Sequence, residues 1–560
     1  MTGATVTDVA PPAPEATTAE ALIGAPGDGS SVARGSLVNL AGSVVFGVTG
    51  FLLIVVVTRN LGTSGAGALF EAIALFSIVS RSAMAGTDVG LVRFTSRFLA
   101  RHRTREVGAL YRVALVPVAV VSSLAGLAVF LLAGPLADLV TIGDDHHGLP
   151  SYLRVLAPFI PVAAVYQAID GATRGFGTMV PSVVVDRVGR SSALPLLVLL
   201  ASTAGGATLV GVAWAAPFAV ALVATALWTV ALLRRAERSL TARIDAGELT
   251  VATAAATDDL ADIDARPGEG AELGPDPTVV PLPLDRRDLT RRFWSFALPR
   301  SFAGVFALTI TWVDILLLGS MEGTDAVGVY SAAIRWLIVG NVVGNAVTLA
   351  FAPQIAKVMA TEGPDGAKPA FQEASALLLL LAWPAYVTAM VFAPFLLTAF
   401  GDGFGDGATV IAITGAGFLL ASAAGPIDML LLMAGRSRQS LINTAVALVA
   451  NIGANLLLIP RYGIEGAALA WAFSLVVANG LPLWQMWRSL GVHPFGARTL
   501  RTMALAAGVA TALVGARALL GPTPEGLALG LGLGGAILLA GVWSSPDRLG
   551  IDQVLRRSTP

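Results

Sequence analysis

The sequence of 560 residues contains no cysteine and only two lysines, Lys357 and Lys368. The missing thiols exclude disulfides, thiolate metal sites and a cysteine nucleophile. Charged residues make up only 13% of the chain, and the formal net charge is −1. No clustered basic face stands out beyond ordinary loop arginines, so the sequence predicts no nucleic-acid partner.

Motifs of nucleotide hydrolysis and metal catalysis are missing as well. No G-x-x-x-x-G-K-[ST] loop occurs, which excludes nucleotide hydrolysis by that route. The adjacent pair His146 and His147 falls in a predicted solvated loop, where a metal site is the less favoured interpretation. Asp262 and Asp264 have the D-x-D spacing of glycosyltransferases, but they lie in an acidic stretch with no strand pattern around them. The sequence therefore predicts no cofactor, no metal and no enzymatic activity.

Long apolar runs dominate what is present. Hydrophobic residues make up 55% of the chain and the mean hydropathy is +0.75, which is typical of polytopic membrane proteins. A helix needs roughly 20 apolar residues to cross the hydrocarbon core. The predicted fold class is an all-α membrane protein with about 14 transmembrane helices, in two six-helix lobes around a central cavity plus two C-terminal helices. The predicted spans are 34–58, 66–92, 107–133, 150–173, 180–202, 207–233, 293–318, 326–352, 370–393, 405–433, 439–459, 465–487, 499–520 and 524–543.

Charges in the connecting loops indicate the orientation of these helices. Short cytoplasmic loops are enriched in lysine and arginine. The loops after the even-numbered helices carry most of the basic residues, whereas the opposite loops are mainly acidic, with Arg59 and Arg461 as the basic exceptions. A single miscounted helix would invert this pattern beyond it. The loops therefore predict a multi-pass protein of the cytoplasmic membrane with both termini in the cytoplasm.

A twelve-residue repeat divides the chain into two related halves. Gly62–Ile73 (GTSGAGALFEAI) returns 261 positions later as Gly323–Ile334 (GTDAVGVYSAAI), with five identical positions. Two halves in the same orientation predict an axis along the membrane normal, as in many secondary transporters. The predicted domains are a disordered cytoplasmic tail (1–33), a six-helix lobe (34–233), an acidic cytoplasmic linker (234–292), a second six-helix lobe (293–487), two extra helices (488–543) and a cytoplasmic tail (544–560).

Three segments resemble a known superfamily. The first, Met433–Ser474, contains the pattern LIP-x-YGI-x-GAA. The second is an N-terminal segment in which residues 61–67 read LG-x-x-x-x-G and residues 88–97 read D-x-G-L-x-x-x-x-x-R. Asp314 with Gly328-Val329-Tyr330 and Ala333 forms the third match. Over roughly residues 34–490, the chain resembles the polysaccharide flippase branch of the multidrug/oligosaccharidyl-lipid/polysaccharide exporter superfamily. Its fourteen predicted helices are also similar to those of lipid II flippases.

The resemblance implies a function and its partners. It implies a flippase that moves a polyprenyl-pyrophosphate-linked oligosaccharide across the lipid bilayer by alternating access, for cell-surface polysaccharide biosynthesis. A polysaccharide polymerase or other assembly proteins would then be partners. Two alternatives stay open: a drug exporter of the same superfamily, and a membrane glycosyltransferase or polysaccharide polymerase. The glycan, the coupling ion and the oligomeric state are left undetermined.

Two arginines are predicted deep inside the membrane. Arg81 lies fifteen residues into the second span and Arg335 nine into the eighth. A central arginine costs roughly 2.5–3.5 kcal/mol on insertion scales, so such residues face a cavity or pair with a partner. The repeat offset places Arg335 opposite Ala74, seven residues or about two turns before Arg81. Both arginines are thus predicted on one face, where a pyrophosphate is the expected ligand, with pairing inside each lobe as the alternative.

Three more arginines are candidates for substrate binding. Arg300 is predicted at the start of the second lobe, beside Pro299. Arg93 and Arg174 lie near cytoplasmic helix ends, where snorkelling and pairing with Asp88 and Asp170 also explain them.

Two acidic residues and three glycines complete the predictions. Asp314 and Asp428 are candidates for ion coupling, with capping or local pairing as the alternative. Gly526, Gly530 and Gly534 recur at a spacing of four and place a flat face on the last helix. Tight packing on the preceding helix is the favoured interpretation, and a groove for the lipid tail is the alternative.

Overall fold

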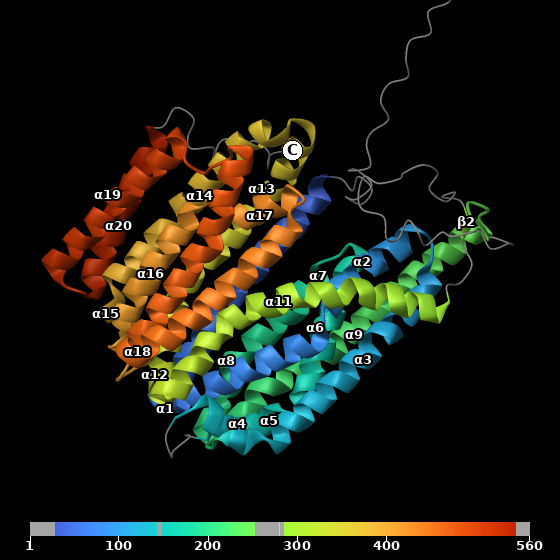
Figure 1. The fold of residues 1–560 in the computed structure, drawn as a ribbon, viewed down its shortest axis with the longest axis horizontal. Coiled ribbons are helices and arrows are strands. Elements are labelled where there is room, and N and C mark those ends of the chain that lie inside the picture. The colour runs from blue at the N-terminus through green and yellow to red at the C-terminus, as the bar shows by residue number, and fades with distance from the viewer. Residues whose placement is uncertain (1–28, 143–147, 252–278, 281–284, 545–560) are drawn as a thin grey trace, which may run out of the picture.

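The computed structural model describes residues 29–142, 148–251, 279–280 and 285–544. The predicted C-terminal tail (544–560) and most of the N-terminal tail (1–33) lie outside these ranges. Figure 1 shows two groups of helices that lie close together at one end, near α4 and α12, and diverge toward the other.

The first lobe consists of nine α-helices with two short irregular stretches. They are α1 (Gly29–Met84), α2 (Thr87–Ala100), α3 (Thr104–Leu131), α4 (Ala133–Val140), α5 (Leu149–Leu156), α6 (Phe159–Thr173), η1 (Arg174–Phe176), α7 (Val180–Ser182), η2 (Val183–Arg190), α8 (Ser191–Ala204) and α9 (Ala207–Asp245).

The second half begins with the long helix α11 and ends with two further helices. Its elements are α11 (Arg286–Glu322), α12 (Thr324–Ile334), η3 (Arg335–Leu337), α13 (Ile338–Thr361), α14 (Gly363–Val391), α15 (Ala393–Leu397), η4 (Thr398–Phe400), α16 (Gly407–Ala423), α17 (Ile427–Met433), α18 (Ser437–Leu490), α19 (Ala497–Leu520) and α20 (Pro524–Trp543).

The all-α class is confirmed, but the count of fourteen spans is not. In the described part of the chain, nine helices are long and apolar enough to cross a membrane, or eleven if each of two bent pairs is one span. Two long helices account for part of the difference: α1 has 56 residues and α18 has 54. A straight helix of that length would be about 80 Å long, far more than the roughly 30 Å hydrocarbon core. Each is in fact two helices joined at a glycine with non-helical backbone angles, Gly62 and Gly463.

The linker is shorter than predicted. The helix before it continues to Asp245 instead of ending at 233, and α11 begins at Arg286 instead of 293. Two short strands lie between these helices in the sequence, and they pair in parallel: β1 (Thr250–Val251) and β2 (Val279–Val280). Both ends of the predicted linker are therefore helical although their sequence is polar. A helix can continue into water beyond the bilayer without apolar residues.

The two copies of the repeat share an unusual backbone. Gly62 has φ 68° and ψ −169°, and its equivalent Gly323 has φ 83° and ψ 179°. Positive φ strains any residue with a Cβ, which explains why glycine occupies both positions. In each half this glycine ends one helix and starts the next, as expected for two halves built on one plan.

The two copies also pack directly on each other. A Cβ on Gly67 would lie 1.8 Å from the Thr324 carbonyl oxygen, and a Cβ on its equivalent Gly328 would lie 2.1 Å from the Thr63 carbonyl oxygen. The Ser64 hydroxyl donates a hydrogen bond of 2.6 Å to Asp325, which is its own equivalent in the second copy. Reciprocal contacts of this kind mark a two-fold relation between the copies. We call this contact between residues 62–73 and 323–334 the repeat junction.

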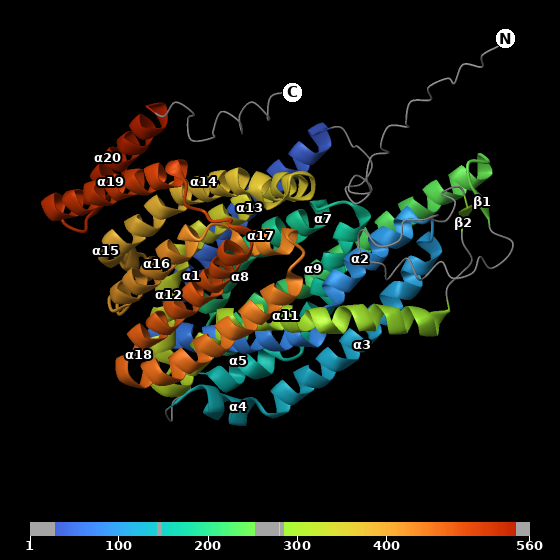
Figure 2. The same ribbon diagram turned by 45° about the horizontal axis from the view of Figure 1, so that its top comes forward.

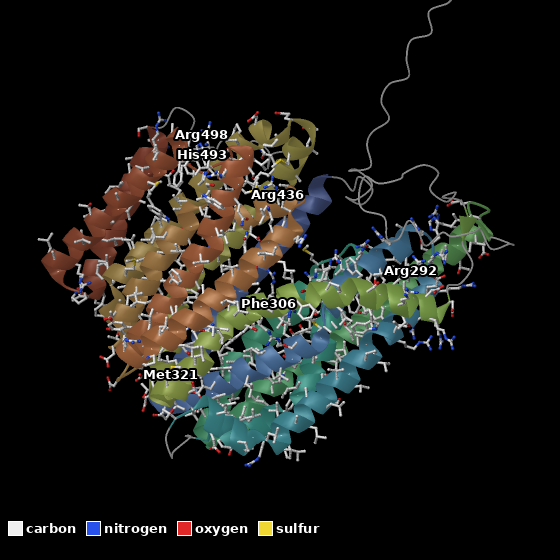
Figure 3. All side chains as sticks on the ribbon, viewed as in Figure 1. Arg292, Phe306, Met321, Arg436, His493 and Arg498 are labelled. Carbon is white, nitrogen blue, oxygen red and sulfur yellow. The ribbon has the colours of Figure 1, made fainter. Side chains whose placement is uncertain are left out.

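Helix α11 does not stay within the second lobe as predicted. In Figure 3, Arg292, Phe306 and Met321 mark its course from the divergent end of the first lobe to the end where the lobes meet. Leu289, Phe293 and Ala297 are buried in a core cluster with residues of α2, α3 and α6. The four-residue spacing of these side chains forms a stripe that the first lobe buries. The predicted boundary at residue 293 is therefore wrong for packing, since the first half of α11 belongs with the first lobe.

The last two helices pack as the favoured interpretation predicts. Helices α19 and α20 lie beside α14, on the side of the second lobe away from the first (Figures 1 and 2). Gly526, Gly530 and Gly534 of α20 are all buried. A Cβ on Gly530 would lie 2.9 Å from Leu513 of α19, and one on Gly534 would lie 3.0 Å from Val509.

Replacing Gly530 by leucine is expected to separate α20 from α19. The added side chain overlaps Leu513, and overpacking of this kind costs about 1–3 kcal/mol. Size-exclusion chromatography after heating in detergent should show a lower midpoint of thermal aggregation. Gly532→Leu is the matched control because a Cβ there meets nothing within 4 Å. Equal midpoints for the two variants would contradict the packing role of the small face.

Candidate functional site

Arg81 lies next to a break between α1 and α2. Helix α1 ends at Met84, and the backbone turns through Ala85 (φ 50°) and Gly86 (φ 72°) into α2. This turn brings Arg81 within 3.1 Å of the Asp88 carboxylate. Asp88 is buried and Arg81 is half-buried. Asp88 was predicted to pair with Arg93. Because the chain reverses its direction at Ala85 and Gly86, Asp88 forms its ion pair with Arg81 instead.

The same turn packs directly on α11. A Cβ on Gly86 would lie 2.4 Å from the Ala297 carbonyl oxygen, and one on Gly90 would lie 2.8 Å from the Phe293 ring. Only residues without a side chain allow the backbones to approach this closely. The turn beside the Arg81–Asp88 pair is therefore held against α11, whereas Asp88 itself packs against Gly171 of α6.

Arg93 and Arg300 meet on one aromatic ring. The Cζ atom of Arg93, on α2, lies 4.2 Å from the centre of the Phe296 ring, and that of Arg300, on α11, lies 3.7 Å from it. Arg300 also donates a hydrogen bond of 3.3 Å to the Phe296 carbonyl oxygen and is exposed. A guanidinium over an aromatic face is stabilised without losing its charge or all of its donors.

Two of the five predicted arginines thus meet at Phe296 of α11, and a third, Arg81, lies next to the turn that packs on this helix. Arg81, Arg93 and Arg300, together with Asp88, form what we call the arginine cluster, with three cations and one carboxylate. Planar guanidinium groups bind phosphate oxygens in pairs, so guanidinium groups at this position can contact an anionic head group. Sequence spacing could not reveal the cluster, because Arg300 lies more than 200 residues from the other two.

Arg335 lies outside the arginine cluster. Helix α12 ends at Ile334, and Arg335 begins the tighter 3₁₀ turn η3. The side chain is half-buried, and its Nε atom is buried with no hydrogen-bond partner among the described residues. Its neighbour Trp336 packs on Phe51 of α1 and Phe400 of η4, with ring centres 4.6 and 6.1 Å apart.

The common face predicted for Arg81 and Arg335 stays a prediction. Ala74, the position equivalent to Arg335, is fully buried in the continuous helix α1. The second copy departs from this geometry at η3, so the repeat offset no longer relates side-chain directions beyond Ile334. The described contacts of the two arginines share no residue.

Arg174 and Asp428 are exposed on their own elements. Arg174 begins η1, and the nearby Asp170 accepts a hydrogen bond of 2.8 Å from Ser182. Asp428 accepts a hydrogen bond of 2.7 Å from Ser440. The local-pairing alternative therefore describes the contacts of Asp428.

Asp314 differs from Asp428 in being buried. Only 1% of its surface is exposed, and its carboxylate accepts a hydrogen bond of 2.5 Å from Tyr330. The backbone N–H of Ile315 also donates to it at 3.1 Å. The bond to Tyr330 ties α11 to α12, which places an ionisable group inside the second half.

Glu71 is a buried carboxylate that was not among the residues predicted from the sequence. This glutamate lies inside the first copy of the repeat and is fully buried. Its equivalent in the second copy is Ala332. The signal available in the sequence was this single carboxylate in an otherwise apolar repeat.

Two surface hollows of about 640 and 630 Å³ lie along the extended end of α9. The first is lined by Trp228, Arg235 and Arg243 among others. None of the five predicted arginines lines either hollow. In the described residues, no group of three or more histidine, aspartate or glutamate side chains could hold a metal ion.

The apolar helices and their two-fold repeat are typical of a multi-pass membrane transporter. The chain belongs to the MatE family, whose model matches residues 40–199 and 299–457, together more than half of the sequence. The two matched ranges each cover one copy of the repeat.

Relatives and solved structures support this fold. The uncharacterized membrane protein YabM of Bacillus subtilis (strain 168) is 26% identical over 212 residues, which are 36% of this chain and 40% of that protein. The chain thus spans less than half of this curated relative. The lipid II flippase MurJ in an inward closed conformation matches with a TM-score of 0.62 and 12% identity over 92% of this chain and 99% of that chain. An inward-facing multidrug transporter of the MOP superfamily matches with a TM-score of 0.56 and 17% identity over 78% and 94%. At these identities the likeness shows the fold alone.

Proposed function

We propose that this protein is a flippase that moves a polyprenyl-pyrophosphate-linked oligosaccharide across the cytoplasmic membrane by alternating access. Its product would serve cell-surface polysaccharide biosynthesis, with a polymerase or other assembly proteins as partners. Both termini face the cytoplasm in this proposal. The repeat junction then lies at the outer side, and the arginine cluster lies toward the inner side.

The observation that carries the proposal is the unpartnered Nε of Arg335. A cation in a membrane-spanning segment requires a compensating charge or hydrogen bonds. Arg335 has neither a described carboxylate partner nor an acceptor for its Nε. An anionic ligand supplies both, and a pyrophosphate offers two phosphate groups to a forked donor.

The arginine cluster supports an anionic head group as well. We assign Arg81, Arg93 and Arg300 to the first contact with the pyrophosphate at the inner side, with Arg174 at the nearby surface. Asp314 and Asp428 are proposed to couple transport to an ion gradient. The buried Asp314 is the stronger candidate, because its hydrogen bond to Tyr330 depends on how α11 and α12 are arranged.

The alternative functions predict different charges. A site for cationic drugs would be lined by carboxylates, whereas the candidate binding residues named here are five arginines. A membrane polymerase or glycosyltransferase would need an acidic catalytic motif on a large outer loop. The segments that join the helices at the repeat-junction end are short, and the longest connection joins α9 to α11.

The test is translocation of fluorescent polyprenyl-pyrophosphoryl oligosaccharide in proteoliposomes. An impermeant quencher added outside should bleach only the outer leaflet in empty vesicles, and both leaflets when the wild-type protein is present. Arg81→Ala is expected to slow the second phase several-fold. Arg112→Ala is the control, because this exposed residue bonds only the Gly108 carbonyl of its own helix. No translocation by the wild type, or unchanged rates in both Arg81→Ala and Arg335→Ala, would contradict the proposal. Uptake of a cationic dye in its place would favour the drug exporter.

A further inference from the structure

Glu71 lies where three elements meet beside the repeat junction. Its carboxyl belongs to the part of α1 that follows Gly62. One oxygen, Oε2, accepts a hydrogen bond from the hydroxyl of Thr141, the residue that ends α4. The other oxygen, Oε1, faces Gly319 of α11, where an added Cβ would lie 2.3 Å from it.

The surroundings of Oε1 leave no room for a charged partner. Oε1 is buried and has no hydrogen-bond partner among the described residues. The same added Cβ on Gly319 would lie 2.6 Å from the Val140 carbonyl oxygen, so two oxygens face one spot. The Ile142 N–H donates to the Gly319 carbonyl oxygen at 3.1 Å, which holds the end of α4 against α11.

Other titratable groups on the surrounding elements are occupied or face elsewhere. Asp314 of α11 binds Tyr330, and Asp325 of α12 accepts from Thr63 and Ser64. Glu322 of α11 is exposed and lies near Gly463 of α18. Asp138 of α4 has interactions of its own.

A charged carboxylate in this position would lack compensation. Burial of an ionised group without a cation costs several kcal/mol, and the group takes up a proton instead. A proton on Oε1 removes the charge and turns this oxygen, unpartnered among the described residues, into a hydroxyl.

We propose that Glu71 is a proton-binding site whose occupancy closes the junction of α1, α4 and α11. The carboxyl holds a proton on Oε1 while the three elements are packed. Separation of α11 and the end of α4 from α1 lets water reach Glu71, and the O–H bond then gives its proton to that water and leaves a solvated carboxylate. This inference does not depend on what the protein transports.

The test measures opening without any substrate. Because the chain has no native cysteine, spin labels can be attached at Asn60→Cys and Asp402→Cys, exposed positions on the two halves at this end. In lipid nanodiscs, the distance between the labels should lengthen as pH rises. Glu71→Gln is expected to keep the short distance at every pH, because the amide is neutral. Glu322→Gln, which changes an exposed carboxylate at the same end of α11, should respond to pH as the wild type does.

Three results would overturn the inference. The first is a label-to-label distance in Glu71→Gln that still lengthens as pH rises. The second is a wild-type distance that does not change with pH, and the third is a distance that changes with sodium concentration at constant pH. Infrared spectroscopy gives a second measurement that does not need the Glu71→Gln variant. The protonated-carboxyl band of the closed state should move to higher frequency in Thr141→Val, because its C=O loses a hydrogen bond. A band that does not move would contradict protonation at Glu71.

Discussion

Replacing Arg335 by leucine is expected to abolish translocation while leaving thermal stability unchanged or raising it. Removing one partner of a desolvated charge pair typically costs 2–5 kcal/mol of binding, or about 30-fold to several thousand-fold in affinity. The free protein loses nothing comparable, because the Nε atom it gives up has no partner. Replacing a buried charge by a well-packed apolar side chain is often neutral or stabilising.

The two readouts separate a ligand role from a structural one. Transport is measured by the quenching assay and stability by the midpoint of thermal aggregation without substrate. Arg335→Lys should retain part of the transport, since lysine keeps the charge but loses the fork that binds two oxygens. Arg112→Leu should leave transport unchanged. A large fall in stability of Arg335→Leu would mean that the arginine serves the fold.

Replacing Gly67 or Gly328 by alanine is expected to prevent closure of the repeat junction. The added Cβ would overlap a backbone carbonyl oxygen that cannot rotate away, at 1.8 Å in one case and 2.1 Å in the other. A cost of about 3 kcal/mol would shift the equilibrium away from the closed form by more than about 100-fold. A transporter that cannot close one end cannot alternate, so translocation should fall to background.

Because the two copies contact each other reciprocally, the two glycine substitutions are expected to have the same effect. The labels at residues 60 and 402 should report the same long distance in Gly67→Ala and in Gly328→Ala, at every pH. Gly50→Ala and Gly304→Ala are the controls, because a Cβ at either position meets nothing within 4 Å. Unequal effects of the two junction variants, or closure in either of them, would contradict reciprocal packing.

Much of the fold could be predicted because it depends on local properties of the chain. The apolar runs predicted the all-α class, since roughly 20 apolar residues are both necessary for a membrane span and visible in a sequence. The repeat was visible because both copies need the same backbone, with glycine at positions 62 and 323. The end of α9 at Asp245 and the start of α11 at Arg286 were missed because helices in water need no apolar sequence.

The candidate site was predicted less well than the fold, because its contacts join segments that are far apart in the sequence. Sequence depth identified Arg81, Arg300 and Arg335 as unusual cations, but the partner of a side chain depends on which elements pack together. Arg93 lost its expected partner Asp88 because the chain reverses at Ala85 and Gly86. Glu71 attracted no attention because its burial comes from Thr141 and Gly319, which lie 70 and 248 residues away.

The sequence by itself determined a helical membrane protein with two related halves, and it predicted arginines inside the membrane. Hydrophobicity, glycine at positions of positive φ and the charge of each side chain are carried by the residues themselves. Only the tertiary structure decided that α11 packs on the first lobe, that Arg93 and Arg300 meet on its Phe296 ring and that the two repeat copies close on each other. These features arise from contacts between distant segments, and such contacts depend on how surfaces fit in space rather than on the order of residues along the chain.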